Sequence, residues 1–483
     1  MRRHVAALLV LGVLVALAGC TAPTDLGLSS PTAPPDPAED TLGWEQGYWH
    51  NESLPVTTAN GLNQSELNAV VGRSMARVEH LRHLEFEKRV PVEVISRQQY
   101  RTQYAGGGNA SSAIRTFDNA KFEALLLVGE TGDSLDQQSQ NRGSSVLGFY
   151  SPSADRIVII SESETPAIQE TTLGHELVHA AQFRTFEMGY EQSTRDEANA
   201  VSGLIEGDAS YVDHLYSQRC GQEWSCVSPP AKSGGGSTQS GGSTFHLGIY
   251  IMKYFPYSDG PGFVGHFKEQ GGWERVNQLY EDPADSAEQV AVPSKYKSDP
   301  PVNVSLADRS SDAWNRVTPR GRAPFGEVGV SGITAMVAWP SYHQEQDGDG
   351  TNQGVVDPRT FLNFQPDGQV SRTDPFNYTN PYAGGWEGDK LYIYEQQNGD
   401  ETAYVWKFAW ESHEDATEFA TAYRGLLRYW GGQQVSGAQG VWRIPSGQFA
   451  DAFYVHVEGD TVVVVNAPTT DQLDDVRAGT PTA

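Results

Sequence analysis

Gly174-His175-Glu176-Leu177-Val178-His179-Ala180 is the stretch that decides how the first half of this chain folds. Its two histidines are four residues apart, so on an α-helix both imidazoles project from one face, about a turn from each other. That spacing suits two ligands of a tetrahedral zinc ion. Glu176 would lean toward the same ion and can take a proton from a metal-bound water. The stretch therefore predicts a metal-binding helix; the alternative is a solvated helix with two surface histidines.

Hydrophobic periodicity places this helix within a mixed α and β region. Apolar residues recur at helical spacing over 65–86, and strand patterns follow at 90–96, 144–150 and 156–161. The last two strands are joined by a Ser-Pro-Ser-Ala-Asp turn and form a predicted hairpin. Thr165 and Pro166 then have the residue types of a helix N-cap and first turn, so the metal-binding helix is predicted over about 165–186.

A third zinc ligand is expected from elsewhere in the chain, because catalytic zinc usually has three protein ligands. Residues 202–216 have helical periodicity, and Glu206 lies there beside the small residues Gly207 and Ala209. Small residues let a second helix approach closely. Glu197, which is closer to His179 in the sequence, is a rival third ligand.

The HExxH stretch together with Glu-Gly-x-Ala resembles the glutamate zincins (gluzincins), a family of zinc peptidases. A strand hairpin followed by the metal-binding helix is also the order of elements in zincin catalytic domains, whose edge strand holds an extended substrate. The resemblance covers about 60–300. It implies that His175, His179 and Glu206 hold Zn²⁺, and that Glu176 is the general base for cleavage of a peptide or protein substrate.

Further site residues are less sharply defined. In the thermolysin-like branch an Asp four residues after the glutamate orients a histidine, but Ser210 occupies that position here. Asp208 or Asp213 is expected to take over that role. His246 and Tyr250, in a segment that resembles the next helix of this group, are the candidates for stabilising the oxyanion; both are equally compatible with packed aromatic side chains.

The first residues have the features of an exported lipoprotein. Residues 1–19 combine an arginine pair with a short apolar run, as a signal peptide does, and Leu-Ala-Gly-Cys20 resembles a lipobox. Residues 20–42 are rich in Pro, Ser, Thr and Asp and read as a disordered tether. We therefore expect a protein on the extracellular face of the membrane, anchored through a lipid on Cys20.

Charge and cysteine content agree with that location. The net charge of -27 argues against a nucleic-acid partner, and an evenly acidic, lysine-poor chain looks like a halophilic archaeal surface protein, the alternative being an ordinary acidic secreted protein. Cys220 and Cys226 are predicted to form a disulfide in an oxidising exterior. Five sequons are candidate glycosylation sites: Asn51, Asn63, Asn109, Asn303 and Asn377.

Two domains are predicted, both of the α+β class. A zincin-like domain with a mixed sheet and metal-binding helices is expected over 43–300, a polar linker over 301–312, and a small antiparallel α+β domain over 313–483. In the second, strand hairpins are expected at 390–396 with 403–410 and at 453–457 with 461–465, and a helix capped by Ser412 between them. A non-catalytic surface or adhesion lipoprotein that keeps the fold is the alternative function. The oligomeric state is not determined by these patterns.

Overall fold

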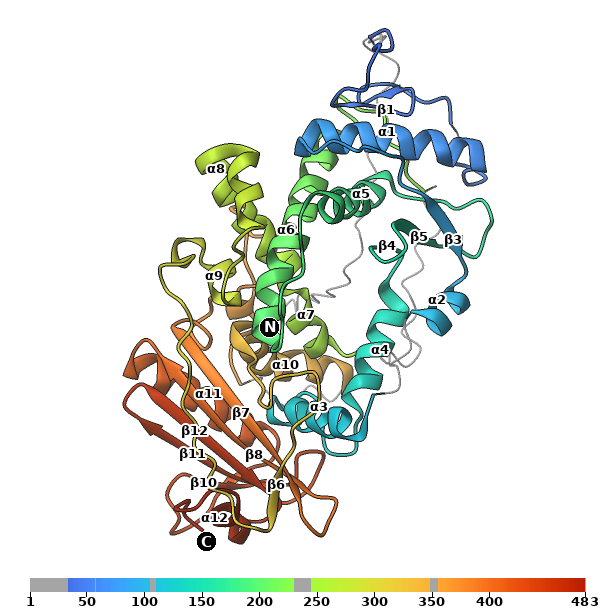
Figure 1. Ribbon diagram of the computed structural model, residues 1–483. Coiled ribbons are helices and arrows are strands. Elements are labelled where there is room, and N and C mark those ends of the chain that lie inside the picture. The colour runs from blue at the N-terminus through green and yellow to red at the C-terminus, as the bar shows by residue number, and fades with distance from the viewer. Residues whose placement is uncertain (1–33, 57, 105–109, 230–244, 348–354, 483) are drawn as a thin grey trace, which may run out of the picture.

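The computed structural model describes residues 34–56, 58–104, 110–229, 245–347 and 355–482 (Figure 1). The predicted signal peptide, Cys20, most of the tether and the Asn109 sequon lie outside these ranges. Within them the chain is mixed α and β with several sheets, as predicted at that level. None of the helices in these ranges combines the length and the apolar character needed to cross a membrane.

A three-stranded sheet lies near the predicted metal-binding helix. It consists of β3 (Val92–Ile95), β5 (Arg156–Ile160) and β4 (Gly148–Ser151), in that order. β3 runs parallel to β5, and β4 pairs with β5 in the antiparallel direction, so the predicted hairpin and the mixed sheet are confirmed. β4 is an edge strand of this sheet. Its outer edge is not paired with another strand of this sheet.

Nine helices and a short strand pair make up the rest of the described part before residue 300. The strand pair is β1 (Trp44–Glu45) with β2 (Tyr48–Trp49). The helices are α1 (Gln64–Arg82), α2 (Arg97–Gln103), α3 (Ser112–Ala124), α4 (Ser134–Ser145), α5 (Glu170–Thr185), α6 (Arg195–Arg219), α7 (Leu247–Ser258), α8 (Gly260–Leu279) and α9 (Ala287–Ala291), followed by a 3₁₀ turn at Pro293–Lys295.

The start of α5, the predicted metal-binding helix, was predicted wrongly. α5 begins at Glu170 rather than near Thr165, and its N-cap Gln169 makes no side-chain capping bond. The Thr165 hydroxyl instead donates to Asn60 O at 2.9 Å, and Pro166 O accepts from Leu62 N at 3.0 Å. Thr165 and Pro166 therefore belong to a loop, because their contacts with the segment before α1 hold them outside the helix.

A buried ion cluster determines where α5 starts. The Glu170 carboxylate is fully buried and pairs with Arg73 at 2.7 Å and with Arg77 at 2.6 Å, both on α1. It also accepts from the Tyr216 hydroxyl of α6 at 2.8 Å and from Val227 N at 2.6 Å. A buried carboxylate needs this many donors to offset its desolvation. The cluster thereby ties the first turn of α5 to α1 and α6.

The small residues beside Glu206 serve a different helix contact from the one predicted. Gly207 faces Gly260 at the start of α8: a Cβ at Gly207 would lie 2.4 Å from the Gly260 backbone. The glycine therefore allows α6 to cross close to α8, whereas Ala209, also on α6, is fully buried in the core.

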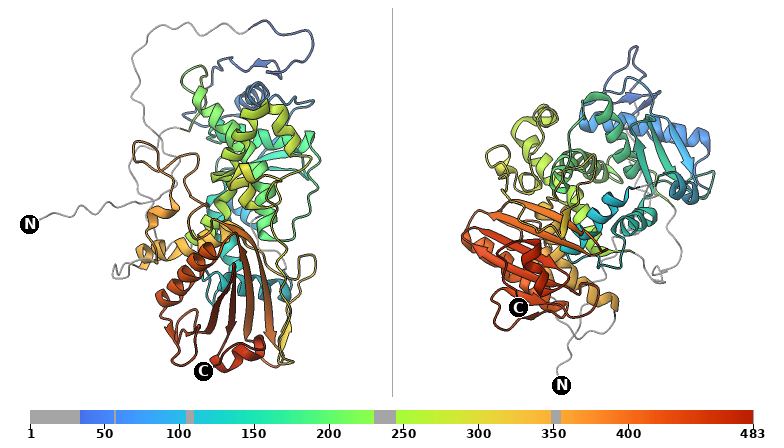
Figure 2. Two further views of the ribbon diagram at one scale, coloured as in Figure 1. Left: turned by 90° about the vertical axis from the view of Figure 1, so that its left-hand side faces the viewer. Right: turned by 60° about the horizontal axis from the view of Figure 1, so that its bottom comes forward.

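The C-terminal segment forms a seven-stranded sheet in which every neighbouring pair is antiparallel (Figure 2). The strand order is β6 (Trp314–Arg316), β7 (Trp386–Gln396), β8 (Thr402–Trp410), β12 (Thr461–Ala467), β11 (Ala452–Glu458), β10 (Val441–Arg443) and β9 (Gln433–Gln434). Both predicted hairpins are confirmed. So is the predicted cap, because the Ser412 side chain accepts from Asp415 N at the start of α11 (His413–Tyr429), which packs on one face of the sheet. The chain ends near α12 (Leu473–Val476).

One apolar core crosses the predicted domain boundary at 301–312. It includes Leu177 of α5, Met336 of α10 (Gly329–Asp347) and Trp406 of β8. α10 was not predicted, and it packs against both α6 and α7. Two further 3₁₀ turns, at Pro358–Phe361 and Thr470–Gln472, join the later elements. The second half of the chain therefore supports the helices that carry the candidate site.

Candidate metal centre

Three of the predicted side chains meet between α5 and α6. The His175 and His179 rings project from one face of α5, and their Nε2 atoms are 3.2 Å apart. Glu206 of α6 brings its Oε2 to 3.4 Å from His175 Nε2 and to 3.2 Å from His179 Nε2. These three residues are one of three groups in the described part of the chain whose ligand atoms are close enough to share a metal ion.

The spacing of the three atoms fits zinc. Ligands that lie about 2.0–2.1 Å from a tetrahedral metal ion are separated from one another by roughly 3.3 Å, and all three measured separations are close to that value. The Glu206 Oε2 atom is buried and has no hydrogen-bond partner among the described residues. Two imidazoles and one carboxylate are also the donor set of known catalytic zinc sites.

Charge interactions within this group are strong. Burial opposes ionisation of Glu206, but the neighbouring His179 and His175 rings outweigh it and hold the Glu206 pKa well below its usual range. Burial likewise disfavours the charged form of His179, yet the Glu206 carboxylate raises the pKa of His179 to about 9. A metal cation bound between the three groups would replace the proton on the His179 ring.

A hydrogen-bonded chain behind His179 orients its ring. His179 Nδ1 lies 2.9 Å from Gln182 Oε1, and the Gln182 amide group donates to Ile205 O at 2.9 Å and to Asp208 Oδ2 at 3.3 Å. Asp208 is itself paired with the buried Arg82 at 2.8 Å. Because Nδ1 donates to Gln182, a cation that displaces the Nε2 proton would find the Nε2 lone pair directed at it, the tautomer that a metal ligand needs.

Asp208 and Asp213, the acids predicted to orient a histidine, and the rival ligand Glu197 lie in different relations to the two histidines. Asp208 reaches His179 only through Gln182, whereas Asp213 is near enough to His175 for their charges to interact. Glu197 belongs to the capping box at the start of α6, where its Oε2 accepts from Thr194 N at 3.0 Å. Glu206, not Glu197, therefore joins the two histidines.

Glu176 lies beside the metal ligands and opens onto a cleft. Its Oε2 accepts from the backbone N of Tyr150 on β4 at 2.7 Å, so the carboxylate bridges α5 and the free edge of that strand. Burial raises the Glu176 pKa, against the opposing effect of His175 and His179. A base with a raised pKa is suited to removing a proton from water near neutral pH.

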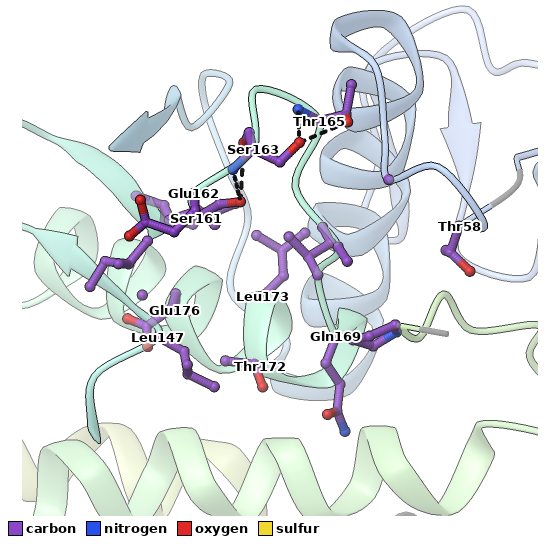
Figure 3. A pocket seen from close by; sticks show the side chains of 18 of the residues that line it. Thr58, Leu147, Ser161, Glu162, Ser163, Thr165, Gln169, Thr172, Leu173 and Glu176 are labelled. Carbon is purple, nitrogen blue, oxygen red and sulfur yellow. Dashed lines mark hydrogen bonds between the residues drawn. The ribbon is translucent and has the colours of Figure 1, made fainter. Parts of the chain in front are cut away.

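The cleft has a volume of about 720 Å³ and runs between the β4–β5 hairpin, the loop before α5 and the first half of α5. Figure 3 shows Glu176 and Leu147 at one end, and Ser163 and Thr165 at the other. Much of its wall is apolar, with contributions from Leu147, Ile159, Ile160, Ile168 and Leu173. It can therefore accept an extended chain with an apolar side chain.

Tyr257 is a site residue that the sequence analysis missed. Its hydroxyl interacts with Glu206, and its ring stacks near His175 with the ring centroids 6.4 Å apart. Although its side chain is 37 % exposed, the protein around its hydroxyl and the carboxylates of Glu206 and Glu176 raise the Tyr257 pKa above its usual range. The phenol therefore keeps its proton and can donate a hydrogen bond. Tyr250, Tyr254 and Tyr257 stack in succession along α7, and that spacing is the sequence signal that could have revealed Tyr257.

The two residues predicted for the oxyanion role lie nearer the start of α7, where His246 is the N-cap and Tyr250 follows four residues later. Both ring nitrogens of His246 are used by the fold: Nε2 lies 2.7 Å from Leu127 O, and Nδ1 accepts from Ile249 N at 3.2 Å. Its ring also stacks on Trp339. Tyr250 stacks on Tyr254, at the end of the aromatic row away from Tyr257. Tyr257 thus occupies the position beside the ligands that was predicted for these two side chains.

The remaining predictions concern the disulfide and the glycosylation sites. The predicted disulfide between Cys220 and Cys226 is present, just after α6. Asn303 is exposed, with its Oδ1 accepting from Lys390 Nζ. Asn63 caps α1, whereas Asn51 and Asn377 are partly buried.

Comparison with known proteins assigns no activity. The family described as Domain of unknown function (DUF8575) matches residues 316–477, a range that contains none of the candidate metal ligands. No curated protein matches the chain. No solved structure matches it.

Proposed function

We propose that this protein is an extracellular, lipid-anchored zinc peptidase of gluzincin type with a zincin-like catalytic region. The observation that carries the proposal is the mutual spacing of 3.2–3.4 Å among the Nε2 atoms of His175 and His179 and the Oε2 atom of Glu206. This spacing suits Zn²⁺. Zinc bound there would lower the pKa of a water molecule and polarise a carbonyl group.

The chain's own residues supply the other parts of a hydrolysis site. Glu176 is placed to accept a proton from the attacking water and to pass it to the leaving amine. The Tyr257 hydroxyl, which keeps its proton, is placed to donate to the oxyanion that develops on the scissile carbonyl. The free edge of β4 and the apolar cleft next to Glu176 can hold an extended peptide.

The cell-surface location is part of the proposal. It rests on the lipobox-like Cys20, outside the described residues, and is supported by the Cys220–Cys226 disulfide, because such bonds persist in oxidising compartments.

The test is the substitution Glu176→Gln in the zinc-loaded protein. We expect the variant to bind one zinc ion as the wild type does and to lose hydrolysis of a mixed peptide library. Glu187→Gln, the same chemical change at an exposed position just after α5, is the matched control and should keep activity. Full activity in Glu176→Gln contradicts the mechanism. Zinc binding without cleavage by the wild type would instead favour the non-catalytic surface protein.

A further inference from the structure

A second group of possible metal ligands lies where the N-terminal segment meets α1. Its members are Asp40, which precedes β1, Glu45, the last residue of β1, and Glu85, which follows α1. One carboxylate oxygen from each residue lies within 4.8 Å of the other two. β1 packs against α1 (Figure 1). Three acids from two separate parts of the chain therefore converge, and none of them belongs to the metal centre between α5 and α6.

A tight turn brings Asp40 and Glu45 together. Trp44 N donates to Thr41 O at 2.9 Å. Gly43, within this turn, has a φ of 88°, a conformation that glycine adopts readily and other residues rarely do. The turn reverses the chain, so the residues just before and just after it face each other.

The buried Glu79 carboxylate of α1 holds this turn against the loop that follows α1. Its Oε2 accepts from Gly43 N at 2.9 Å, and its Oε1 accepts from Phe86 N at 2.9 Å. Gly43 is two residues before Glu45. Phe86 directly follows Glu85. The two bonds therefore fix the backbone positions from which these acids approach each other.

Glu45 is the member of the group that points to a ligand. The residue is only 2 % exposed, and its Oε1 atom is buried without a hydrogen-bond partner among the described residues. Its Oε2 atom accepts a long bond of 3.4 Å from Gln46 Nε2. In the described ranges no basic side chain forms a salt bridge with any acid of the group. A buried carboxylate without a cationic partner is costly, and a bound metal ion supplies the missing charge.

The donor set selects a hard cation. All three candidate ligand atoms are carboxylate oxygens, whereas zinc sites are dominated by nitrogen and sulfur donors. Ca²⁺ binds oxygens at about 2.3–2.6 Å, so two oxygens on opposite sides of one ion are about 4.6–5.2 Å apart. Separations within 4.8 Å are compatible with that limit. Asp40 and Glu85 are exposed, which leaves room for the water molecules that complete a calcium shell.

We propose that Asp40, Glu45 and Glu85 bind a calcium ion that fastens the N-terminal segment to the end of α1. The ion would thereby stabilise a helix on which the metal centre depends, because Arg82 at the end of α1 pairs with Asp208 behind His179 at 2.8 Å. The proposal does not depend on peptidase activity.

The experiment titrates Ca²⁺ into the full-length protein after chelation and reloading with zinc, and calorimetry measures the binding. We expect one saturable site with a Kd of about 0.1–1 mM, the range of extracellular calcium modules, and at least about tenfold weaker binding of Mg²⁺, which gives up its water reluctantly. Titrations at about 0.1 M and about 1 M ionic strength separate a built site from diffuse attraction to an acidic surface, because screening shortens that attraction from about 10 Å to about 3 Å.

Three results of these titrations would overturn the proposal. They are the absence of saturable Ca²⁺ binding, equal affinity for Mg²⁺, and binding that disappears at the higher ionic strength.

Substitutions then assign the ion to this group. Glu85→Gln and Asp40→Asn change exposed carboxylates, so both variants should fold, and each should weaken Ca²⁺ binding at least about tenfold through loss of a charged ligand. Glu45→Gln should abolish binding. Glu87→Gln, the same change at an exposed position in the same loop, and Glu130→Gln, in the third group of possible ligands, are the controls and should bind as the wild type does. Wild-type affinity in the first two variants, or loss of binding in either control, contradicts the assignment.

Hydrogen exchange measures whether the ion fastens the two segments. The N–H groups of Gly43 and Phe86 both donate to Glu79, so bound Ca²⁺ should slow the exchange of these two amides in the wild type. In Glu85→Gln the same Ca²⁺ concentration should leave their exchange unchanged. Calcium binding that alters neither amide in the wild type refutes the fastening role.

Discussion

Replacing Gln182 with Leu tests whether the hydrogen-bonded chain behind His179 prepares this ring to bind metal. Gln182 is fully buried, and its Oε1 lies 2.9 Å from His179 Nδ1. Leucine has a similar size but no acceptor, so the Nδ1–H would be left buried and unpaired, or the proton would move to Nε2 and block the ligand atom. Loss of such a partner usually lowers metal affinity 10–100-fold, which corresponds to about 1.4–2.7 kcal/mol.

The assay is zinc competition against a chromophoric chelator, with circular dichroism to confirm that each variant is folded. Gln182→Glu is the matched variant. It keeps an acceptor for the Nδ1–H but loses the donor to Ile205 O, so we expect zinc affinity to be retained while stability falls. Wild-type zinc affinity in Gln182→Leu would refute the reasoning. An equal loss in both variants would show that packing, rather than the acceptor, is responsible.

Two further changes give independent expectations. Tyr257→Phe should lower kcat about 100-fold, as loss of an oxyanion donor does, with KM and zinc affinity unchanged, whereas Tyr254→Phe should leave kcat unaltered. Asp451→Asn should change the pH dependence of the free energy of unfolding. Burial raises the pKa of Asp451 from 3.8 to about 7. The contribution of the protonated Asp451 to stability is therefore complete below pH 3.8 and is lost as the pH rises through 7. In urea unfolding, the stability of the variant relative to the wild type should therefore be greater at pH 8 than at pH 4. The same relative stability at both pH values would contradict the raised pKa of Asp451.

The local sequence was enough to predict the helix that carries the two histidines and several strand hairpins. The positions of His175 and His179 depend only on the four-residue spacing of a helix, so their convergence could be inferred before any tertiary contact was known. Alternation and turn residues likewise predicted the β4–β5, β7–β8 and β11–β12 hairpins, because their strands are adjacent in sequence. Glu206 was chosen over Glu197 from its small neighbours. Zinc, peptidase activity and the lipid anchor stay predictions.

Only the tertiary structure decided which distant groups meet. α5 starts at Glu170 because Arg73 and Arg77, almost a hundred residues earlier, enclose its carboxylate, and no local capping residue reveals that. α8 escaped prediction because its glycines weaken the helical pattern, and its backbone departs from helical geometry at Gly271 and Gly272. Tyr257 reaches Glu206 through the packing of α6 against α7. Side-chain spacing within one element is set by backbone geometry, whereas contacts between elements depend on how the whole core packs.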